Sequence, residues 1–368
     1  MASEKIPANR GDLFEAFFAA AVAARFVKRA KTKSQKRLPP VAQSDVDKIL
    51  TEMMRAGYQK GVNDVGSTVV DTVTVSVSIP KKASDFLATK TNWSKVSDLR
   101  TGAINFANSH TRLNAQARGL SINERQDSIK ITAAGTEDQK GTKADVKVEV
   151  NSPTNPDKRF RNIDYSLKVS GGEQFHQVSG QGFDKFLNIF GEMGVDVSPM
   201  AKKYDEFIND FFDTEVFTRK YTSRGQAETT GGGPKLKASA QIVYKYAAKK
   251  LIESLGVEGE NPGKTKFADY IIFGLSRNVN TELVKFVGGG VVKTRVANRE
   301  FRDILVNNTY DVVINSSGDP KIVISVGGKK IVQIRYKLEV ASGKSGGQKV
   351  YKFYPRHYLE ALEGLFTI

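Results

Sequence analysis

Two short segments in the middle of the chain alternate polar and apolar residues with a period of two. They span residues 143–150 and 164–169, and this alternation predicts two strands, each with one apolar and one polar face. Each polar face carries three side chains, namely Asp145, Lys147 and Glu149 on the first strand and Asp164, Ser166 and Lys168 on the second. If the strands pair, Asp145 and Lys168 can converge at one place on a sheet.

Helical patterns fill much of the rest of the chain before residue 280. We expect an apolar helix from Asn9 or Asp12 to about residue 29, and a second helix from Ser44, with Asp47 three residues later, to about residue 58. Further helices are expected at residues 84–119, 180–190, 198–212, 237–255 and 264–276, and further strands at residues 69–79 and 128–134. This mixture predicts an α/β (α+β) fold, with a mixed sheet flanked by helices.

The C-terminal part of the chain has a different texture. From residue 282 it consists of short apolar runs separated by Gly, Asn and Asp, with one helix near residues 297–305. Runs of this kind predict antiparallel strands joined by turns. We therefore expect two domains, residues 1–280 and a β-rich subdomain of residues 281–368.

Composition limits the class of protein. The 368 residues, 39% of them hydrophobic and 26% charged, are typical of a globular chain with a sizeable core. No apolar run is long enough to span a membrane, and the apolar stretch at residues 13–27 lacks the flanks of a signal peptide. The absence of cysteine excludes disulfides and thiolate metal sites, and it fits a reducing cytosol. We therefore expect a cytoplasmic protein that does not enter a membrane.

The charge of the chain points to an anionic partner. The formal net charge is +16, and a strongly basic chain favours binding to nucleic acid. Residues 16–40 hold seven basic residues and no acidic one, and residues 218–250 hold eight basic residues and a single acid, Glu228. Tyr221 in the second stretch could stack on bases, whereas core packing is the expected role of Tyr244 and Tyr246. DNA is the expected partner, and a homodimer is left open.

Several sequence features carry groups suited to one chemistry. Glu15 stands in the apolar N-terminal helix, where an acid without a partner or a metal would cost free energy. Asp145 opens the first strand, and the second strand holds Ser166, Leu167 and Lys168 before a polar crossing at residues 171–180 leads into a helix. A carboxylate that holds a divalent metal, beside a lysine that polarises a water, is suited to cutting a phosphodiester.

This order resembles the catalytic core of the PD-(D/E)XK nuclease superfamily, the restriction-endonuclease-like fold, over residues 9–30 and 125–195. In that family, a helix with a glutamate, a strand with an aspartate and a strand with Glu/Asp-X-Lys precede a further helix. The resemblance assigns Asp145 to the metal-binding aspartate, Lys168 to the motif lysine and Glu15 to the helix glutamate. Ser166 stands where a second carboxylate is usual, and the acids that could replace it are Glu15, Asp164, Glu173 and Asp184.

The resemblance implies a metal-dependent endodeoxyribonuclease, and the sequence suggests a phage or mobile-element member acting in a bacterial or phage-infected cell. Mg²⁺, or Mn²⁺, would be held by Asp145, Glu15 and the carbonyl of Leu167, with Ser166 as a ligand or placeholder. Lys168 would orient or help deprotonate the attacking water. The expected DNA contacts are Lys143, Gln177, Gln181, Arg219, Lys220 and Arg224.

Other chemistries are not indicated by the sequence. The three histidines, His110, His176 and His357, lack the spacing of a zinc site, and the glycine triplets at 231–233 and 288–290 lack the ending of an ATP-binding loop. The alternative is a non-enzymatic nucleic-acid-binding protein, such as a virion or nucleoid component, that keeps a nuclease-like sheet. Ser166, in place of a second carboxylate, is its best support.

Overall fold

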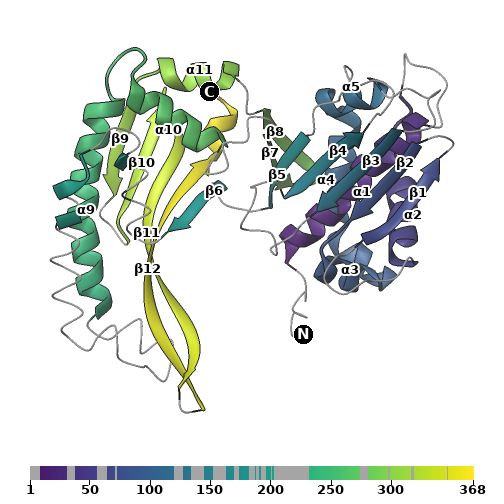
Figure 1. Cartoon of the computed structure of the whole chain (residues 1–368), viewed down its shortest axis with the longest axis horizontal. Coiled ribbons are helices and arrows are strands. Elements are labelled where there is room, and N and C mark those ends of the chain that lie inside the picture. The colour runs from purple at the N-terminus through teal and green to yellow at the C-terminus, as the bar shows by residue number, and fades with distance from the viewer. Residues whose placement is uncertain are drawn as a thin grey trace. The chain divides into compact units, whose positions relative to one another are not determined.

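The structure, a computed structural model, divides the chain into two compact units (Figure 1). Unit 1 contains Met1–Gly172 and Asn278–Ala297, and unit 2 contains Glu173–Arg277 and Asn298–Ile368. The residues that the structure describes are 9–30, 38–55, 64–70, 73–119, 127–133, 145–151, 163–169, 174–181, 187, 190–191, 196–199, 201–202, 232–273, 281–296, 299–315, 319–345 and 347–368.

This division differs from the expected boundary near residue 280. The chain enters unit 2 after Gly172, returns to unit 1 at Asn278 and leaves it again after Ala297. Residues 281–296 were expected to begin the β-rich subdomain, but they complete the sheet of unit 1 instead. Each unit is therefore built from two separate stretches of sequence.

Unit 1 is built on a mixed sheet whose strands follow the order β1-β2-β3-β4-β5-β7-β8. Its strands are β1 (Asp64–Val70), β2 (Val73–Ser78), β3 (Asp127–Ala133), β4 (Val146–Asn151), β5 (Ile163–Val169), β7 (Thr281–Gly288) and β8 (Val291–Val296). The pairs β2/β3 and β5/β7 are parallel, and the other neighbours are antiparallel. The mixed sheet expected from the sequence is confirmed, although the strand predicted at residues 69–79 is two strands, β1 and β2.

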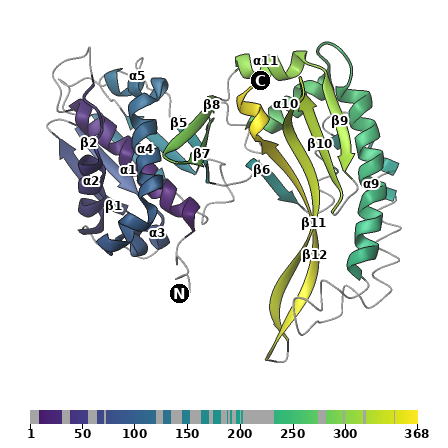
Figure 2. The ribbon, with the colours of Figure 1, turned by 180° about the vertical axis from the view of Figure 1, so that it is seen from behind.

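The N-terminal helix is the centre of the core of unit 1. The helices are α1 (Arg10–Ala30), α2 (Gln43–Arg55), α3 (Lys81–Leu87), the 3₁₀ helix η1 (Lys90–Val96), α4 (Ser97–Ser109) and α5 (Thr111–Gly119). Helix α1 is buried all round from Asp12 to Phe26, as expected of a helix whose sequence is apolar on every side. It contacts β2, β3 and β5 on one side and α2 and α4 on the other, and Figure 2 shows these helices together on one face of the sheet.

Unit 2 is built on an antiparallel sheet of order β6-β12-β11-β10-β9. Its strands are β6 (Gln174–Gln181), β9 (Tyr310–Asn315), β10 (Lys321–Val326), β11 (Lys329–Ser345) and β12 (Gln348–Leu362), and its helices are α9 (Gly232–Leu255), α10 (Pro262–Phe273), α11 (Arg299–Asn307) and η5 (Glu363–Phe366). Helix α9 contacts β9 and β10, and α10 contacts both α9 and α11. The β-rich C-terminal part is thus confirmed, with helices from the middle of the chain packed on it.

A polar group lies inside the core of unit 2. The Oη of Tyr244 on α9 is 3.0 Å from the Nδ1 of His357 on β12, and both residues are buried. The ring of Tyr336 on β11 lies 5.7 Å from that of His357. Burial lowers the pKa of His357 from 6.5 to about 3, so the imidazole is neutral in the folded protein over the physiological range. The expected core role of Tyr244 is confirmed.

The polar crossing expected at residues 171–180 is a strand where the structure describes it. Residues 174–181 form β6, which pairs with the edge of β12 from His357 to Leu362. Glycine is depleted in strands, so the tertiary context decides here. Among the helices that the structure describes, none is both long enough and apolar enough to span a membrane.

Candidate active site on the mixed sheet

The register of β4 and β5 places Asp145 opposite Ser166. The two strands pair at Val146 with Tyr165 and at Lys147 with Asp164, and the backbone N–H of Asp145 donates to the carbonyl oxygen of Tyr165 at 2.8 Å. One further step along this antiparallel register brings Asp145 beside Ser166. Side chains two residues apart share a face, so Asp164, Ser166 and Lys168 lie on the same face as Asp145.

The carboxylate of Asp145 is held by the neighbouring strand. Its Oδ2 accepts the backbone N–H of Leu167 at 2.5 Å and lies 3.3 Å from the Oγ of Ser166. The side chain therefore satisfies a backbone donor at the place where the β4–β5 ladder ends. Two bonds to one oxygen fix the direction of the carboxylate, which is a requirement for any group that must hold a metal or a water.

The electrostatics of Asp145 are set by opposing influences. Burial raises the pKa of its carboxyl, while the charge of Lys168 and the hydrogen bonds from Leu167 and Ser166 act to lower it. Burial prevails, so the pKa of Asp145 is above its ordinary value of 3.8. A half-buried carboxylate beside a lysine is the type of perturbed pair that concentrates at functional sites, although structural ion pairs also produce it.

Helix α1 covers the other face of the sheet. The ring of Phe18 on α1 lies 5.0 Å from that of Tyr165, and Tyr165 alternates with Ser166 along β5, so the two side chains point to opposite faces. Glu15 is 7% exposed and belongs to this helix. The structure thus brings together Asp145, Ser166 and Lys168, and it places Glu15 on the helix that covers the opposite face.

Sequence reasoning missed one lysine on the site's face. Lys285 on β7 is the register partner of Lys168 in the parallel β5–β7 pair, and it is 1% exposed. A buried lysine needs anionic or hydrogen-bonding partners. This part of the sheet therefore holds a second positively charged side chain besides Lys168. Its signal in the sequence was weak, because the run 283–287 was interpreted as part of the C-terminal subdomain rather than as the neighbour of β5.

The described residues fit a divalent ion that keeps most of its waters. Mg²⁺ is usually held by one or two carboxylates together with water and substrate phosphate, and Asp145 supplies one such carboxylate, with Asp164 two residues before Ser166 on the same face. The Leu167 backbone, expected to give a carbonyl ligand, lies beside the Asp145 carboxylate. Within the described ranges, no group of three or more His, Asp or Glu residues could hold a metal ion by itself.

Most of the expected DNA contacts and two of the replacement acids fall outside the part of the chain that the structure describes. These are Lys143, Arg219, Lys220, Arg224, Glu173 and Asp184. Gln177 and Gln181 lie on β6 at the edge of the unit 2 sheet, paired with Glu360 and His357, so they belong to the other unit from Asp145. Their assignment to the DNA contacts stays a prediction.

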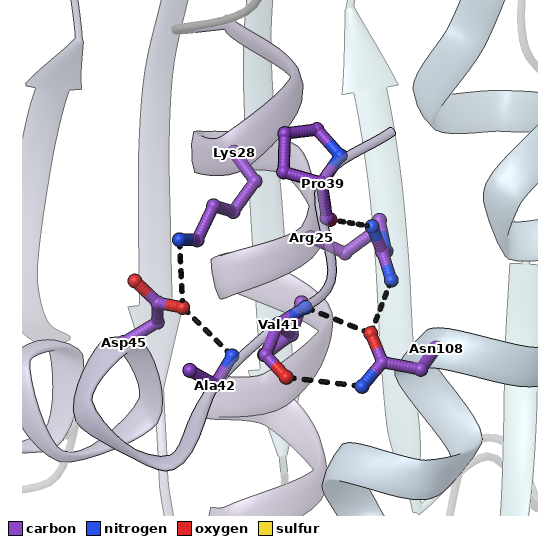
Figure 3. Close-up of polar contacts among 7 residues, drawn as sticks. All are labelled: Arg25, Lys28, Pro39, Val41, Ala42, Asp45 and Asn108. Carbon is purple, nitrogen blue, oxygen red and sulfur yellow. Dashed lines mark hydrogen bonds and ion pairs between the residues drawn. The ribbon is translucent and has the colours of Figure 1, made fainter. Parts of the chain in front are cut away.

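Some basic side chains of the first basic stretch, residues 16–40, form hydrogen bonds and ion pairs within unit 1 (Figure 3). The guanidinium of Arg25 donates to the carbonyl oxygen of Pro39, at 2.7 Å, and to the Oδ1 of Asn108, at 2.6 Å. Its Nε–H also donates to the carbonyl oxygen of Ala107 at 3.0 Å. The Oδ1 of Asn108 accepts the N–H of Val41 at 2.7 Å as well. Arg25 therefore ties α1 to α4 and to the segment that precedes α2.

Two other arginine and lysine side chains of this stretch have internal roles as well. Lys28 pairs with Asp45 on α2 at 3.0 Å, and Arg29 is fully buried, with its Nη2 3.4 Å from the carbonyl oxygen of Arg118. The expectation that this stretch lies on DNA as a whole is corrected for Arg25 and Arg29, because buried guanidinium groups cannot reach a phosphate.

No protein-family model, curated protein or solved structure matches the chain. Its chemistry must be inferred from the geometry of the residues themselves. The constellation that combines a fixed carboxylate, a hydroxyl and a lysine on one face of adjacent strands is the strongest candidate for a site in the described part of unit 1.

Proposed function

We propose that this protein is a metal-dependent deoxyribonuclease, with Mg²⁺ as the metal and Asp145 and Lys168 as its central catalytic residues. The observation that carries the proposal is the carboxylate of Asp145, held at 2.5 Å by the N–H of Leu167 on the adjacent strand, with Lys168 on the same face. The order of helix, aspartate strand and Ser-X-Lys strand adds support through the resemblance to PD-(D/E)XK nucleases.

Each residue has a separate role in the proposed reaction. Asp145 would hold the cation. Asp164, on the same face of β5, is the favoured candidate for the second acidic ligand. Lys168 orients the attacking water and stabilises the negative charge that develops on the phosphate. The bound cation would polarise the scissile phosphate and stabilise the leaving oxygen. Lys285 is buried, so it would not contact DNA and would act on this face only through its positive charge.

The test is cleavage of plasmid DNA by the purified protein in Mg²⁺ or Mn²⁺. Lys168→Ala is expected to reduce the cleavage rate by a factor of about 10² or more, since a positioned proton-transfer or charge-stabilising group is lost. Asp145→Asn is expected to abolish cleavage, because the neutral amide holds a divalent cation poorly. DNA binding in Ca²⁺ should change little for Lys168→Ala.

Lys130→Ala is the matched control. Lys130 on β3 is exposed and pairs with Glu149 of β4, so it shares the face of Asp145 and carries the same charge at a distance of two strands. The Lys130→Ala variant should cut DNA at the parental rate. Cleavage by Lys168→Ala at the parental rate would show that the site is wrongly assigned.

The alternative function is binding of nucleic acid without catalysis. One observation favours it: Ser166 stands in place of a second acid. This alternative becomes the better account if the parent protein binds DNA but cuts no duplex, branched or single-stranded substrate with either metal.

A further inference from the structure

The last two strands of unit 2 are much longer than their neighbours. Strand β11 runs to Ser345 and pairs with β12 from Val332 with Ala361 to Ser345 with Gln348. Pairing of β11 with β10 is confined to residues 329–335, and pairing of β12 with β6 to residues 357–362. Residues 337–345 and 348–356 therefore form a two-stranded ribbon, here called the arm, which runs on beyond the other strands of its sheet (Figures 1 and 2).

The arm is strongly basic. Between residues 337 and 356 the sequence has one acid, Glu339, and five basic residues: Lys337, Lys344, Lys349, Lys352 and Arg356. Three aromatic residues stand beside them at positions 351, 353 and 354. The stretch was expected to be an ordinary strand of a β-rich subdomain, and its charge was not singled out because the two largest basic runs lie elsewhere in the sequence.

The register adds a second observation that points to an anionic ligand. Lys344 is directly opposite Lys349 near the tip, and Lys337 is directly opposite Arg356 at the base. Like charges at directly opposed positions destabilise a pair of strands, and an isolated hairpin is only marginally stable in water. The ribbon thus holds two unfavourable pairs that a bound polyanion would relieve.

The dimensions of the arm suit a groove of duplex DNA. At about 3.4 Å per residue, residues 337–345 span about 30 Å, close to the length of one helical turn. The major groove is about 12 Å wide and admits a two-stranded ribbon. Pro355 on β12 has no main-chain N–H, and proline is confined to edge strands, strand starts and bulges. Its presence therefore argues against the addition of another protein strand.

We propose that the arm, residues 337–356, binds in the major groove of duplex DNA. This inference rests on the proposed function for the choice of DNA as the polymer. The basic residues at positions 344, 349 and 352, which the register distributes over both faces of the ribbon, supply the positive charge for the phosphates that flank the groove. The binding is largely independent of sequence because phosphate contacts carry no sequence information.

The test compares two triple variants for binding to a labelled duplex of about three helical turns, in Ca²⁺, as a function of salt. Replacing Lys344, Lys349 and Lys352 by Gln should weaken binding on the order of 10²-fold at about 0.1 M salt, and should make the log–log slope less negative by about 2 to 3. The control replaces Lys82, Lys90 and Lys95, all exposed in unit 1, and should bind nearly as the parent does.

A charge reversal gives an independent readout. Lys349→Glu converts the pair with Lys344 into an attractive one, so amide hydrogen exchange in the arm of the free protein should slow. The same change should weaken duplex binding. A charged surface without a role in DNA binding would give the first effect and not the second.

Three results would overturn the proposal. These are parental duplex affinity in the arm variant, an equal loss in the control variant, and a loss of affinity confined to single strands. The test distinguishes this proposal from the proposed nuclease function. If binding depends on the arm but the protein does not cut DNA, the arm proposal stands and the nuclease proposal fails. If the protein cuts DNA but binding does not depend on the arm, the nuclease proposal stands and the arm proposal fails.

Discussion

Arg25→Lys tests whether the first basic stretch is architecture or a DNA contact. The substitution keeps the positive charge, so a purely electrostatic role predicts no change. The structure predicts a loss of stability, because the guanidinium reaches three acceptors in three directions, the carbonyl oxygens of Pro39 and Ala107 and the Oδ1 of Asn108. A single ammonium group cannot reproduce that fork.

The size of the loss follows from the bonds that are broken. Hydrogen bonds from charged donors contribute about 1.5–3 kcal/mol each, and lysine can retain one of the three. Allowing for partial hydration of the freed acceptors, the free energy of unfolding of unit 1 should fall by about 3 kcal/mol. For a unit of this size that corresponds to a fall of about 6–12 °C in the melting temperature of the transition.

The assay is chemical and thermal denaturation, followed by circular dichroism, together with the salt dependence of DNA binding. Lys28→Ala is the control, since its ion pair with Asp45 is partly exposed, at 30% and 26% of the two side chains, and should contribute about 1 kcal/mol or less. A loss below about 1 kcal/mol for Arg25→Lys, or a changed salt slope at full stability, would refute the structural role.

Two further predictions concern pH. The pKa of Asp145 is raised in the folded state, so the stability that its protonated form contributes is fully present below the unfolded pKa of about 3.9 and is lost as pH rises. Asp145→Asn should therefore show a smaller decline in the free energy of unfolding as pH rises above about 4, measured by urea denaturation. The pKa of His357 is lowered to about 3, so unit 2 should lose stability as pH falls below 6.5, by about 2–3 kcal/mol at pH 4.5. His357→Gln should remove this part of the acid sensitivity, and an unchanged acid profile would count against the burial of a neutral imidazole.

Much of unit 1 could be predicted because its signals are local. Period-two alternation identified β4 and β5 and put Asp145, Ser166 and Lys168 on one face, and the pairing register agrees with that assignment. The neighbour of β5 could not be found in this way, because β7 begins more than a hundred residues later in the chain and its pairing depends on tertiary structure. Lys285 was missed for that reason.

The burial of charged side chains was the other feature that could not be predicted from the sequence. The run of basic residues after residue 24 is equally consistent with a solvated face and with arginines that hold a helix to its neighbours, since charge alone does not reveal which acceptors lie nearby. The alternation in β5 had a similar ambiguity. It fixed which residues share a face, but not that α1, with Glu15, covers the opposite one.

The interleaved path of the chain has a consequence for synthesis. Strand β5 is complete once residue 169 has been made, yet β7 and β8, which extend the sheet beyond it, follow only at residues 281–296. During translation β5 is therefore an unprotected edge while much of unit 2 is being made, and such edges invite pairing with other chains. A ribosome-bound or prematurely terminated chain that ends near residue 280 carries Asp145 and Lys168 but lacks Lys285 and the two strands, β7 and β8, that complete their sheet. The order of synthesis thus keeps the proposed catalytic face incomplete until three quarters of the chain has emerged.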